Sequence, residues 1–313
     1  MTIDRVATNS QSQYLLSQIM QAESNLDTTQ AQVTSGKVST TYGGIGDKTA
    51  VLEATRSVAD RTTGYQTATT NALTQVNEQD SQMSSLSDLA NQLRTAITTA
   101  VGNNDGSTLM TTAQGIFDQA SQILNTKDAN GNYLYGGDQN TQPPLTVSDM
   151  SDLTALPSAS AAFQNGTVAS SVMVADGQTV QTGVLASDVG TQLMATLKSI
   201  ADLNAGTPLT SVLTTAQASS LTTAIGTATN AATTVNNVAA QNGNVYSQLQ
   251  DASANQTTMS GLYSTFMSNI ENVDMGTAIT QLNQNQVALQ AAVQVTSQLG
   301  QISLLNYLPA PVA

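Results

Sequence analysis

The sequence lacks the residue types on which most catalytic and metal sites depend. It contains no histidine, cysteine or tryptophan, and only 9% of its 313 residues are charged. Without histidine or cysteine there is no Ser-His or Cys-His nucleophile pair, and no imidazole or thiolate ligand for a metal ion. The sequence therefore predicts that the protein is not an enzyme and has no catalytic, cofactor-binding or metal site. No disulfide bond can form.

Positive charge is also scarce. Eight Lys and Arg residues stand against 21 Asp and Glu residues, for a net charge of −13, and the last basic residue is Lys198. Nucleic-acid binding needs a cationic surface, so we expect no nucleic-acid partner. No apolar run reaches the roughly 18 residues of a membrane-spanning helix, which predicts no membrane insertion. The first ten residues have no basic segment followed by an apolar one, so we expect no Sec-type signal peptide.

Proline placement divides the chain into two arms and a middle. All six prolines lie within 143–208 or 309–311, which leaves 1–142 and 209–308 free of helix-breaking residues. Apolar and small residues recur at alternating steps of four and three along 58–100 and 221–270. This pattern predicts a mainly α fold, in which the N- and C-terminal arms form a long antiparallel helical bundle or coiled-coil rod. A coiled coil between two chains is the alternative, although the flanking positions lack the usual Glu and Lys.

The middle of the chain has the pattern of turns and short strands. Asn130-Gly131, Asn165-Gly166 and Asp176-Gly177 are typical turn dipeptides. Segments 171–175 and 178–182 flank the last of them and predict a hairpin. We expect a small β-rich insert over 140–188, followed by a helix over 189–203.

Three local motifs suggest ligand sites but lack required residues. Ser35-Gly36-Lys37 has neither the first glycine nor the following Ser or Thr of a phosphate-binding loop. The glycine-rich segment 43–48 follows no predicted strand, so we interpret it as a turn. Asp128 begins a calcium-like loop, but Tyr133 and Gln139 stand where glycine and glutamate are needed.

Both ends of the chain resemble the bacterial flagellin superfamily. Segments 270–284 and 288–296 are similar to its C-terminal helix, and 5–9 with 32–37 to its first helix. The Asn-Tyr-Leu-Tyr-Gly-Gly stretch of 132–137, the Pro turn of 141–144 and the closing segment 302–308 resemble the branch that forms the hook-filament junction. Segment 42–48 departs from the family, which usually has an Asp-Asp turn there.

This resemblance implies a structural component of the bacterial flagellum, exported unfolded by the flagellar type III apparatus and located outside the cell. Its domains would be terminal assembly helices over 1–45 and 272–313, a helical rod over 46–139 and 189–271, and an outer domain over 140–188. The implied function is that of a hook-filament junction adaptor. Its partners would be further copies in a ring, a neighbouring hook-associated protein, flagellin and an export chaperone.

Two other functions stay open. The protein could be a filament-forming flagellin, although the Tyr307-Leu308 ending and the small insert argue against it. It could also be a flagellin-like surface protein that binds glycans by stacking Tyr133 and Tyr135 on sugar rings.

The candidate assembly residues are apolar positions of the two terminal helices, where a broad stripe suits packing between subunits. Since isolated helices are marginal in water, we expect 1–40 and 275–313 to be poorly ordered before assembly and 50–270 to fold alone. The predicted interface residues are Leu15, Ile19, Leu26, Ile279, Leu282, Leu289, Val293, Leu299, Ile302 and Leu305.

Overall fold

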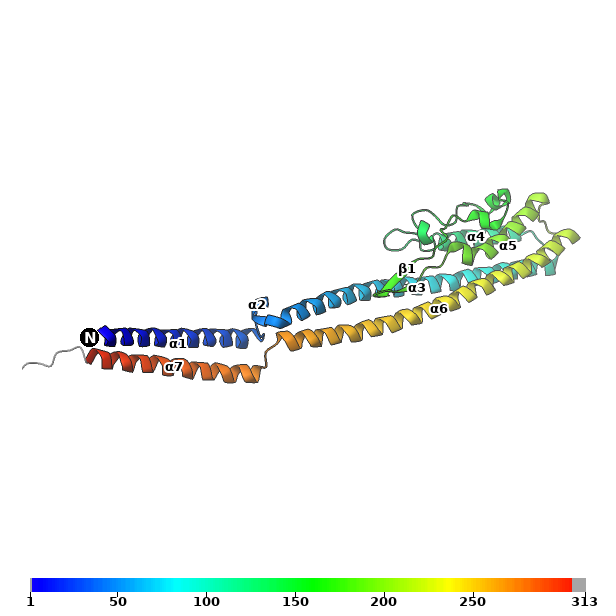
Figure 1. Cartoon of the computed structure of the whole chain (residues 1–313). Coiled ribbons are helices and arrows are strands. Elements are labelled where there is room, and N and C mark those ends of the chain that lie inside the picture. Colours follow the sequence, from blue (N-terminus) through cyan, green and yellow to red (C-terminus); the bar gives the residue numbers. More distant parts are fainter. Residues whose placement is uncertain (1, 306–313) are drawn as a thin grey trace, which may run out of the picture. The chain divides into compact units, whose positions relative to one another are not determined.

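The computed structural model describes the backbone of residues 2–305 and the side chains of residues 10–298 (Figure 1). The α-helices in this range are α1 Thr2–Ser35, α2 Tyr42–Ile45, α3 Thr49–Asn103, α4 Leu109–Leu124, α5 Ala186–Gly206, α6 Thr215–Glu271 and α7 Met275–Leu305. The strands are β1 Ser171–Ala175 and β2 Gln178–Gln181. The prediction of a mainly α fold with long helices from both arms and a small β element is confirmed.

The chain forms two compact units. The first contains the described residues up to Asp60 and from Ser260 onward, and the second is Arg61–Met259. The first unit therefore holds α1, α7, the first turns of α3 and the last turns of α6. The predicted division into three domains uses other boundaries, and it stays a prediction.

In the second unit, α3 and α6 lie side by side and antiparallel (Figure 1). Their facing positions are the rows expected from the sequence, because every member from Thr69 to Ala100 on α3 is buried. Helices α4 and α5 pack against each other and close the core. The largest fully buried side chains of this unit include Phe117, Met83, Leu86, Leu93, Ile97, Leu109 and Leu124.

Amide side chains interrupt the apolar seam between α3 and α6. Asn242 donates from Nδ2 to the carbonyl of Val76 at 2.8 Å, and Gln256 donates from Nε2 to Thr69 Oγ1 at 2.9 Å. Asn242 and Gln256 are buried. A buried polar group needs its partner at one position of the neighbouring helix, so these bonds favour a single register of the pair.

Helix α6 starts where the sequence supplies a capping box. Thr214 Oγ1 accepts from the backbone N–H of Gln217 at 3.2 Å, and Gln217 Oε1 accepts from the N–H of Thr214 at 2.9 Å. This exchange satisfies two N–H groups that a helix start would otherwise leave without partners. It follows Pro208, so the long helix begins soon after the last proline of the middle segment.

The predicted hairpin is present and packs on the helices. Strands β1 and β2 pair antiparallel around Asp176-Gly177, with Gly177 at a positive φ of 72°. Asp176 accepts a hydrogen bond from the hydroxyl of Tyr65 at 2.6 Å and pairs with Arg61 at 3.2 Å. Val174 joins an apolar cluster on the long helices with Ala72, Val76 and Leu249.

The rest of the middle segment is mostly irregular. It contains short 3₁₀ turns at Gly137–Gln139, Met150–Ala155 and Ala159–Ala162. Its start is held to the end of α4 by a side chain, because Asn125 exchanges two hydrogen bonds with the backbone of Leu145, each at 3.0 Å. Helix α5 follows and contains the predicted helix over 189–203.

Candidate assembly site

Helices α1 and α7 lie side by side in the first unit (Figure 1). The buried or half-buried positions of α1 between residues 15 and 33 recur mainly at steps of four and three, as they do when one helix face packs on a neighbour. They include three predicted interface residues, Leu15, Ile19 and Leu26, together with Ala22, Thr29 and Val33. Leu15, Ile19 and Leu26 are only half-buried, since a single partner helix covers just one side of them.

The matching row of α7 consists largely of small or polar residues. Ala278 is fully buried, and Asn285 donates from Nδ2 to the carbonyl of Asn25 and to Thr29 Oγ1, each at 3.2 Å. Small side chains allow the two backbones to approach, and the Asn285 bonds fix the pairing at one level. The full row is Ala278, Leu282, Asn285, Leu289, Ala292 and Thr296.

Large apolar side chains remain in water on both helices. Ile279 and Val293 are 46% and 52% exposed, and both lie at the edge of the α7 row. The sequence predicts Ile279 and Val293 as interface residues together with Leu282 and Leu289. In the structure, the small residues Ala278 and Ala292 pack against α1 in their place. The other large apolar side chains exposed on this pair are Tyr14, Leu16, Met20, Met275, Val287 and Val295.

The candidate interface residues therefore fall into three groups. Five of them lie at the contact between α1 and α7, and these are Leu15, Ile19, Leu26, Leu282 and Leu289. Ile279 and Val293 lie on the exposed side of α7. The side chains of Leu299, Ile302 and Leu305 lie outside the described residues.

The two connectors of the first unit form a short backbone bridge. The N–H of Val38 donates to the carbonyl of Glu271 at 2.7 Å, and the N–H of Val273 donates to the carbonyl of Gly36 at 3.0 Å. Gly36 ends α1 in the left-handed region, at a φ of 69°, where a glycine adds no steric strain. The segment after α1 and the segment before α7 are thus tied together, which brings the two terminal helices into register.

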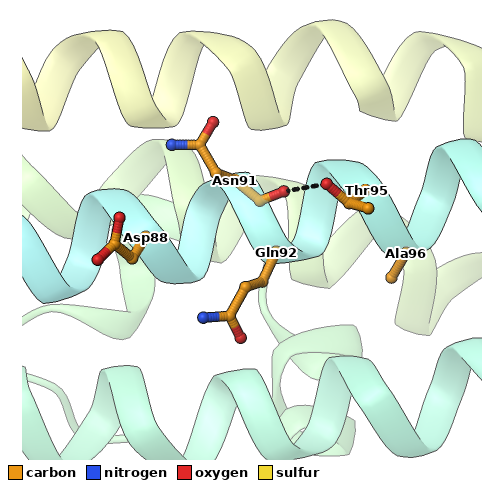
Figure 2. Close-up of a pocket in the computed structure, with 5 residues that line it drawn as sticks. All are labelled: Asp88, Asn91, Gln92, Thr95 and Ala96. Carbon is orange, nitrogen blue, oxygen red and sulfur yellow. Dashed lines mark hydrogen bonds between the residues drawn. The ribbon is translucent and has the colours of Figure 1, made fainter.

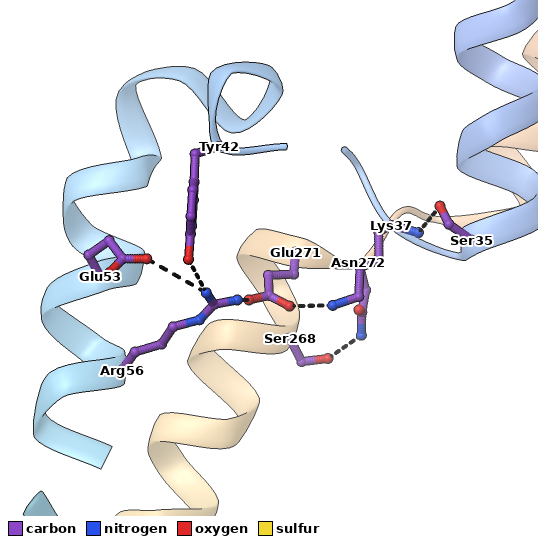
Figure 3. A network of polar contacts seen from close by, with 8 residues as sticks. All are labelled: Ser35, Lys37, Tyr42, Glu53, Arg56, Ser268, Glu271 and Asn272. Carbon is purple, nitrogen blue, oxygen red and sulfur yellow. Dashed lines mark hydrogen bonds and ion pairs between the residues drawn. The ribbon is translucent and has the colours of Figure 1, made fainter. Parts of the chain in front are cut away.

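Glu271, the last residue of α6, joins this bridge to the start of α3 (Figure 3). One carboxylate oxygen pairs with Lys37 at 2.7 Å, and the other accepts a short hydrogen bond from Arg56. Arg56 also donates to the hydroxyl of Tyr42 at 2.6 Å and lies over its ring, 5.6 Å from the centroid. Two of the eight basic residues of the chain therefore meet at one carboxylate, which is only 14% exposed.

This arrangement stabilises the charged form of Glu271. The hydrogen bond from Lys37, reinforced by Arg56, lowers the pKa of the Glu271 carboxyl below its usual range. A carboxylate at the C-terminal end of a helix meets the negative end of the helix dipole, which is unfavourable. The two cations offset that effect, so the position of Glu271 depends on both of them.

Asp274 begins α7 as its capping residue. Its Oδ1 accepts from the N–H of Thr277 at 2.8 Å, and this bond lowers the pKa of the Asp274 carboxyl. A side-chain oxygen at this position satisfies one of the N–H groups left open at a helix start. The sequence thus specifies where α7 begins, a few residues after the end of α6.

The second unit also has a hollow on its surface (Figure 2). It is an open groove along α3, lined by Asp88, Asn91, Gln92, Thr95 and Ala96. The hydroxyl of Thr95 donates a hydrogen bond to the carbonyl of Asn91 at 2.9 Å. Asp88 supplies the one carboxylate of this lining. Among the described residues, no group of three acidic, histidine or cysteine side chains could hold a metal ion.

The aromatic pair behind the glycan hypothesis does not present two rings. Tyr135 is fully buried, and burial raises the pKa of its hydroxyl well above the ordinary value. The ring of Tyr133 is half-buried, and the ammonium of Lys127 lies 4.7 Å from its centroid. Tyr135 therefore cannot stack on a sugar, so the expectation that both rings are available to a glycan is wrong. The calcium-like loop next to it is an ordinary turn, because Asp128 Oδ1 accepts from the N–H groups of Asn130 and Asn132.

Comparison with known proteins agrees with this architecture. Residues 225–308 match the family described as the bacterial flagellin C-terminal helical region. The chain is flagellin-like. No curated protein sequence matches it.

Two solved structures share the fold of this flagellin-like chain. One is described as the structure of a putative flagellar hook-associated protein from Vibrio parahaemolyticus, with a TM-score of 0.58 and 14% identity over 72% of this chain and 97% of that one. The other is FlgL from Bacillus cereus, with a TM-score of 0.53 and 13% identity over 69% of this chain and 98% of that one. At such identities the likeness is one of fold.

Sequence reasoning missed the polar cluster around Glu271. Among the ligand-site motifs, Lys37 belongs to the incomplete phosphate-binding loop. No motif predicts that Arg56 and Glu271 form an ion pair. The scarcity of charged residues in this flagellin-like chain is the one sequence signal for the cluster, because Lys37 and Glu271 both lie near the ends of predicted helices. In the described part of the chain, no helix is long and apolar enough to cross a membrane.

Proposed function

We propose that this protein is a structural component of the bacterial flagellum and acts as a hook-filament junction adaptor. In this proposal the terminal helices α1 and α7 join neighbouring subunits, and the protein has no catalytic role. The observation that carries the proposal is the two-helix pair of the first unit, which covers one side of each helix and leaves large apolar residues in water.

The energetics favour a partner for these exposed side chains. Fully burying a Val, Leu, Ile or Met side chain contributes about 1.5–3 kcal/mol. Leu16 and Met20 on α1 are 58% and 62% exposed, and Val287 on α7 is 65% exposed. They lie outside the α1–α7 contact, so a further helix on each side is needed to cover them.

The composition of α7 supports close packing. Its 31 residues include no Asp, Glu, Lys or Arg. A charged side chain buried between subunits would need a partner, and α7 avoids that requirement altogether. Gln, Asn and Thr side chains can instead hydrogen-bond across a helix interface without loss of an ion's hydration.

The proposal includes the partners and the location. We expect self-association in a ring, contact with a neighbouring hook-associated protein on one side and with flagellin on the other, and binding to an export chaperone before secretion. The protein would then be part of the extracellular flagellum. Residues 1–45 and 272–313 would form the inner assembly helices, with the helical segments 46–139 and 189–271 outside them and 140–188 outermost.

A filament-forming flagellin is the second candidate. The match of residues 225–308 to the flagellin C-terminal region is compatible with it, because that match does not separate the two roles. The likeness to two solved structures, one described as hook-associated and the other as FlgL, supports the junction role. The amount of protein separates the candidates, since a flagellin dominates a purified filament and a junction protein is a trace component.

The proposal is tested by deletion of residues 290–313 in a strain that depends on this protein for motility. We expect the shortened chain to be exported and folded over residues 61–259, with a far-UV spectrum still dominated by helix, but unable to support filament growth. Filament growth at the normal level with the shortened chain would contradict the role given to the C-terminal helix.

A further inference from the structure

The chain contains three Asn-Gly pairs, and the structure treats them very differently. An Asn followed by Gly is the most reactive pair for deamidation, because no side chain on the glycine hinders attack of its backbone nitrogen on the asparagine amide. The reaction needs the asparagine side chain and the next peptide unit to leave their native hydrogen bonds. The pairs are Asn130-Gly131, Asn165-Gly166 and Asn242-Gly243.

Asn165 is held by a partner far away in sequence. Its Nδ2 donates to Ser187 Oγ at 3.1 Å, and its Oδ1 accepts from the N–H of Ser187 at 3.0 Å. The attacking nitrogen is also engaged, because the N–H of Gly166 donates to the carbonyl of Gly136 at 2.8 Å. Opening this site disrupts the contact between the middle segment and the start of α5.

Asn242 is protected by the helix pair. It lies in the interior of α6, is 4% exposed, and donates across to the carbonyl of Val76 at 2.8 Å. Gly243 is a helical residue whose N–H serves the backbone ladder of α6. Reaction here requires local unfolding of a long helix in the core.

Asn130 and Gly131 lie in an exposed turn held only by local bonds. The N–H of Asn130 donates to Asp128 Oδ1 at 2.8 Å, and the N–H of Gly131 donates to the carbonyl of Asp128 at 3.0 Å. Both residues are exposed, and the Cβ position of Gly131 faces open space. In the described chain the Asn130 side-chain amide has no hydrogen-bond partner, so only one exposed turn must open.

We propose that Asn130 is a site of spontaneous deamidation in the folded protein, and that Asn165 and Asn242 are protected. The nitrogen of Gly131 attacks Cγ of Asn130, a C–N bond forms, and the side-chain nitrogen leaves as ammonia. Water then opens the cyclic imide at either carbonyl, which gives aspartate or isoaspartate. The products carry one additional negative charge, and no oxidant or reductant takes part. This inference does not depend on the proposed function.

The product alters the turn that precedes a core segment. Isoaspartate adds a methylene group to the backbone between residues 130 and 131, which changes the spacing of the N–H groups bonded to Asp128. The chain continues directly into Leu134 and Tyr135, both of which are buried. Modification would thus change the loop locally, while the buried residues and the helices keep their contacts.

The test is incubation of the folded, full-length protein in mildly alkaline buffer, followed by tryptic digestion and mass spectrometry. Lys127 and Lys198 bound one tryptic peptide, 128–198, that contains both Asn130 and Asn165, so fragment ions compare the two sites within one molecule. We expect conversion of amide to carboxyl at least about tenfold faster at Asn130 than at Asn165 or Asn242, the ratio given by about 1.4 kcal/mol of activation free energy.

Two controls isolate the effect of the fold. In concentrated urea all three sites should react at comparable rates, because each is followed by glycine. The variant Asn130→Gln should remove most of the native-state reaction, and Asn165→Gln should leave it unchanged. Equal rates at the three sites in the folded protein, or a folded-state rate at Asn130 as low as at the protected sites, would overturn the proposal.

Discussion

At the scale of single residues, the first unit depends on one carboxylate. Glu271 holds Lys37 from the connector after α1 and Arg56 from the start of α3, while its own carbonyl accepts from Val38. Glu53 is a natural control, because it also pairs with Arg56, at 3.6 Å, yet its side chain is 52% exposed. Substitution of each glutamate in turn therefore separates the general effect of removing a negative charge from the specific effect of losing the Glu271 contacts.

We expect Glu271→Gln to weaken the junction and Glu53→Gln to have little effect. The amide introduced at position 271 would keep one hydrogen bond but lose the attraction to both cations. The difference in stability between the natural chain and Glu271→Gln should be smaller at high salt, because both cations are partly exposed and their attraction to Glu271 is screened. Hydrogen exchange at the amides of Val38 and Val273 measures the effect. Equal exchange in both variants would contradict the role of Glu271.

The pH dependence follows from the lowered pKa of Glu271. Its folded-state pKa lies below the ordinary value of 4.5, so its contribution to stability is present above that value and is lost as the pH falls through the folded-state pKa. Asp274 acts in the same direction from an ordinary value of 3.8. Thermal unfolding followed over acidic pH should show a steeper loss of stability for the natural chain than for Glu271→Gln. Parallel curves would show that Glu271 does not titrate with the fold.

At the scale of elements, the sequence predicts where helices lie better than which side of them is covered. The row along α3 is correctly predicted because it is long and has partners on the chain itself, so its members from Thr69 to Ala100 are buried without exception. On α7 the apolar stripe is wider than one partner can cover. The sequence row includes Ile279 and Val293, whereas Ala278 and Asn285 make the contact.

The reason is physical. Periodicity reports which residues avoid water in the final state, whether the partner is the same chain or another one. When the apolar stripe is broad, periodicity does not determine which edge of the stripe packs against the partner helix. On α7 the small residues and the hydrogen bonds of Asn285 to α1 determine that edge. The Glu271 cluster was not predicted, because its members are far apart in sequence. They meet only when the segment after α1 pairs with the segment before α7.

This difference yields a prediction for the exposed edge of α7. The double variant Ile279→Ser with Val293→Ser should change the stability of the monomer by no more than about 0.5 kcal/mol, as for other surface substitutions. It should nevertheless abolish assembly, because it removes apolar surface that only a neighbouring subunit covers. Thermal unfolding of the monomer and filament growth in cells measure the two effects.

A matched control uses polar residues of the same helix. Gln281→Ser with Gln290→Ser changes two exposed positions of α7 without loss of apolar residues. This variant should behave like the natural chain in both measurements. Normal assembly of the Ile279 and Val293 variant would contradict the assignment of that edge to a subunit interface.

At the scale of the whole molecule, the two units bury their residues to different extents. The second unit has a contiguous core that includes Phe117, Leu93 and Leu197, all fully buried. In the first unit the α1–α7 pair has Ala278 as its fully buried apolar residue among the described side chains. We therefore expect the terminal helices to open far more easily than the core in a free monomer.

Limited proteolysis of the monomer with a nonspecific protease tests this expectation. Both ends should be trimmed quickly, leaving a stable fragment that contains residues 61–259. The ends should become resistant once the protein is assembled, because neighbouring subunits then cover them. Ends that resist cleavage in a demonstrably monomeric sample would show that α1 and α7 satisfy their apolar faces within one chain.

The most direct test of the central claim is the position of the protein along an intact flagellum. A small epitope tag inserted in the exposed turn at Asp176-Gly177 would add no residues to α1 or α7, and gold-labelled antibody would locate it by electron microscopy. The proposed adaptor role predicts a single label where the hook meets the filament, and no label further along. Label distributed over the whole filament, or no label on the flagellum of a motile cell, would contradict it.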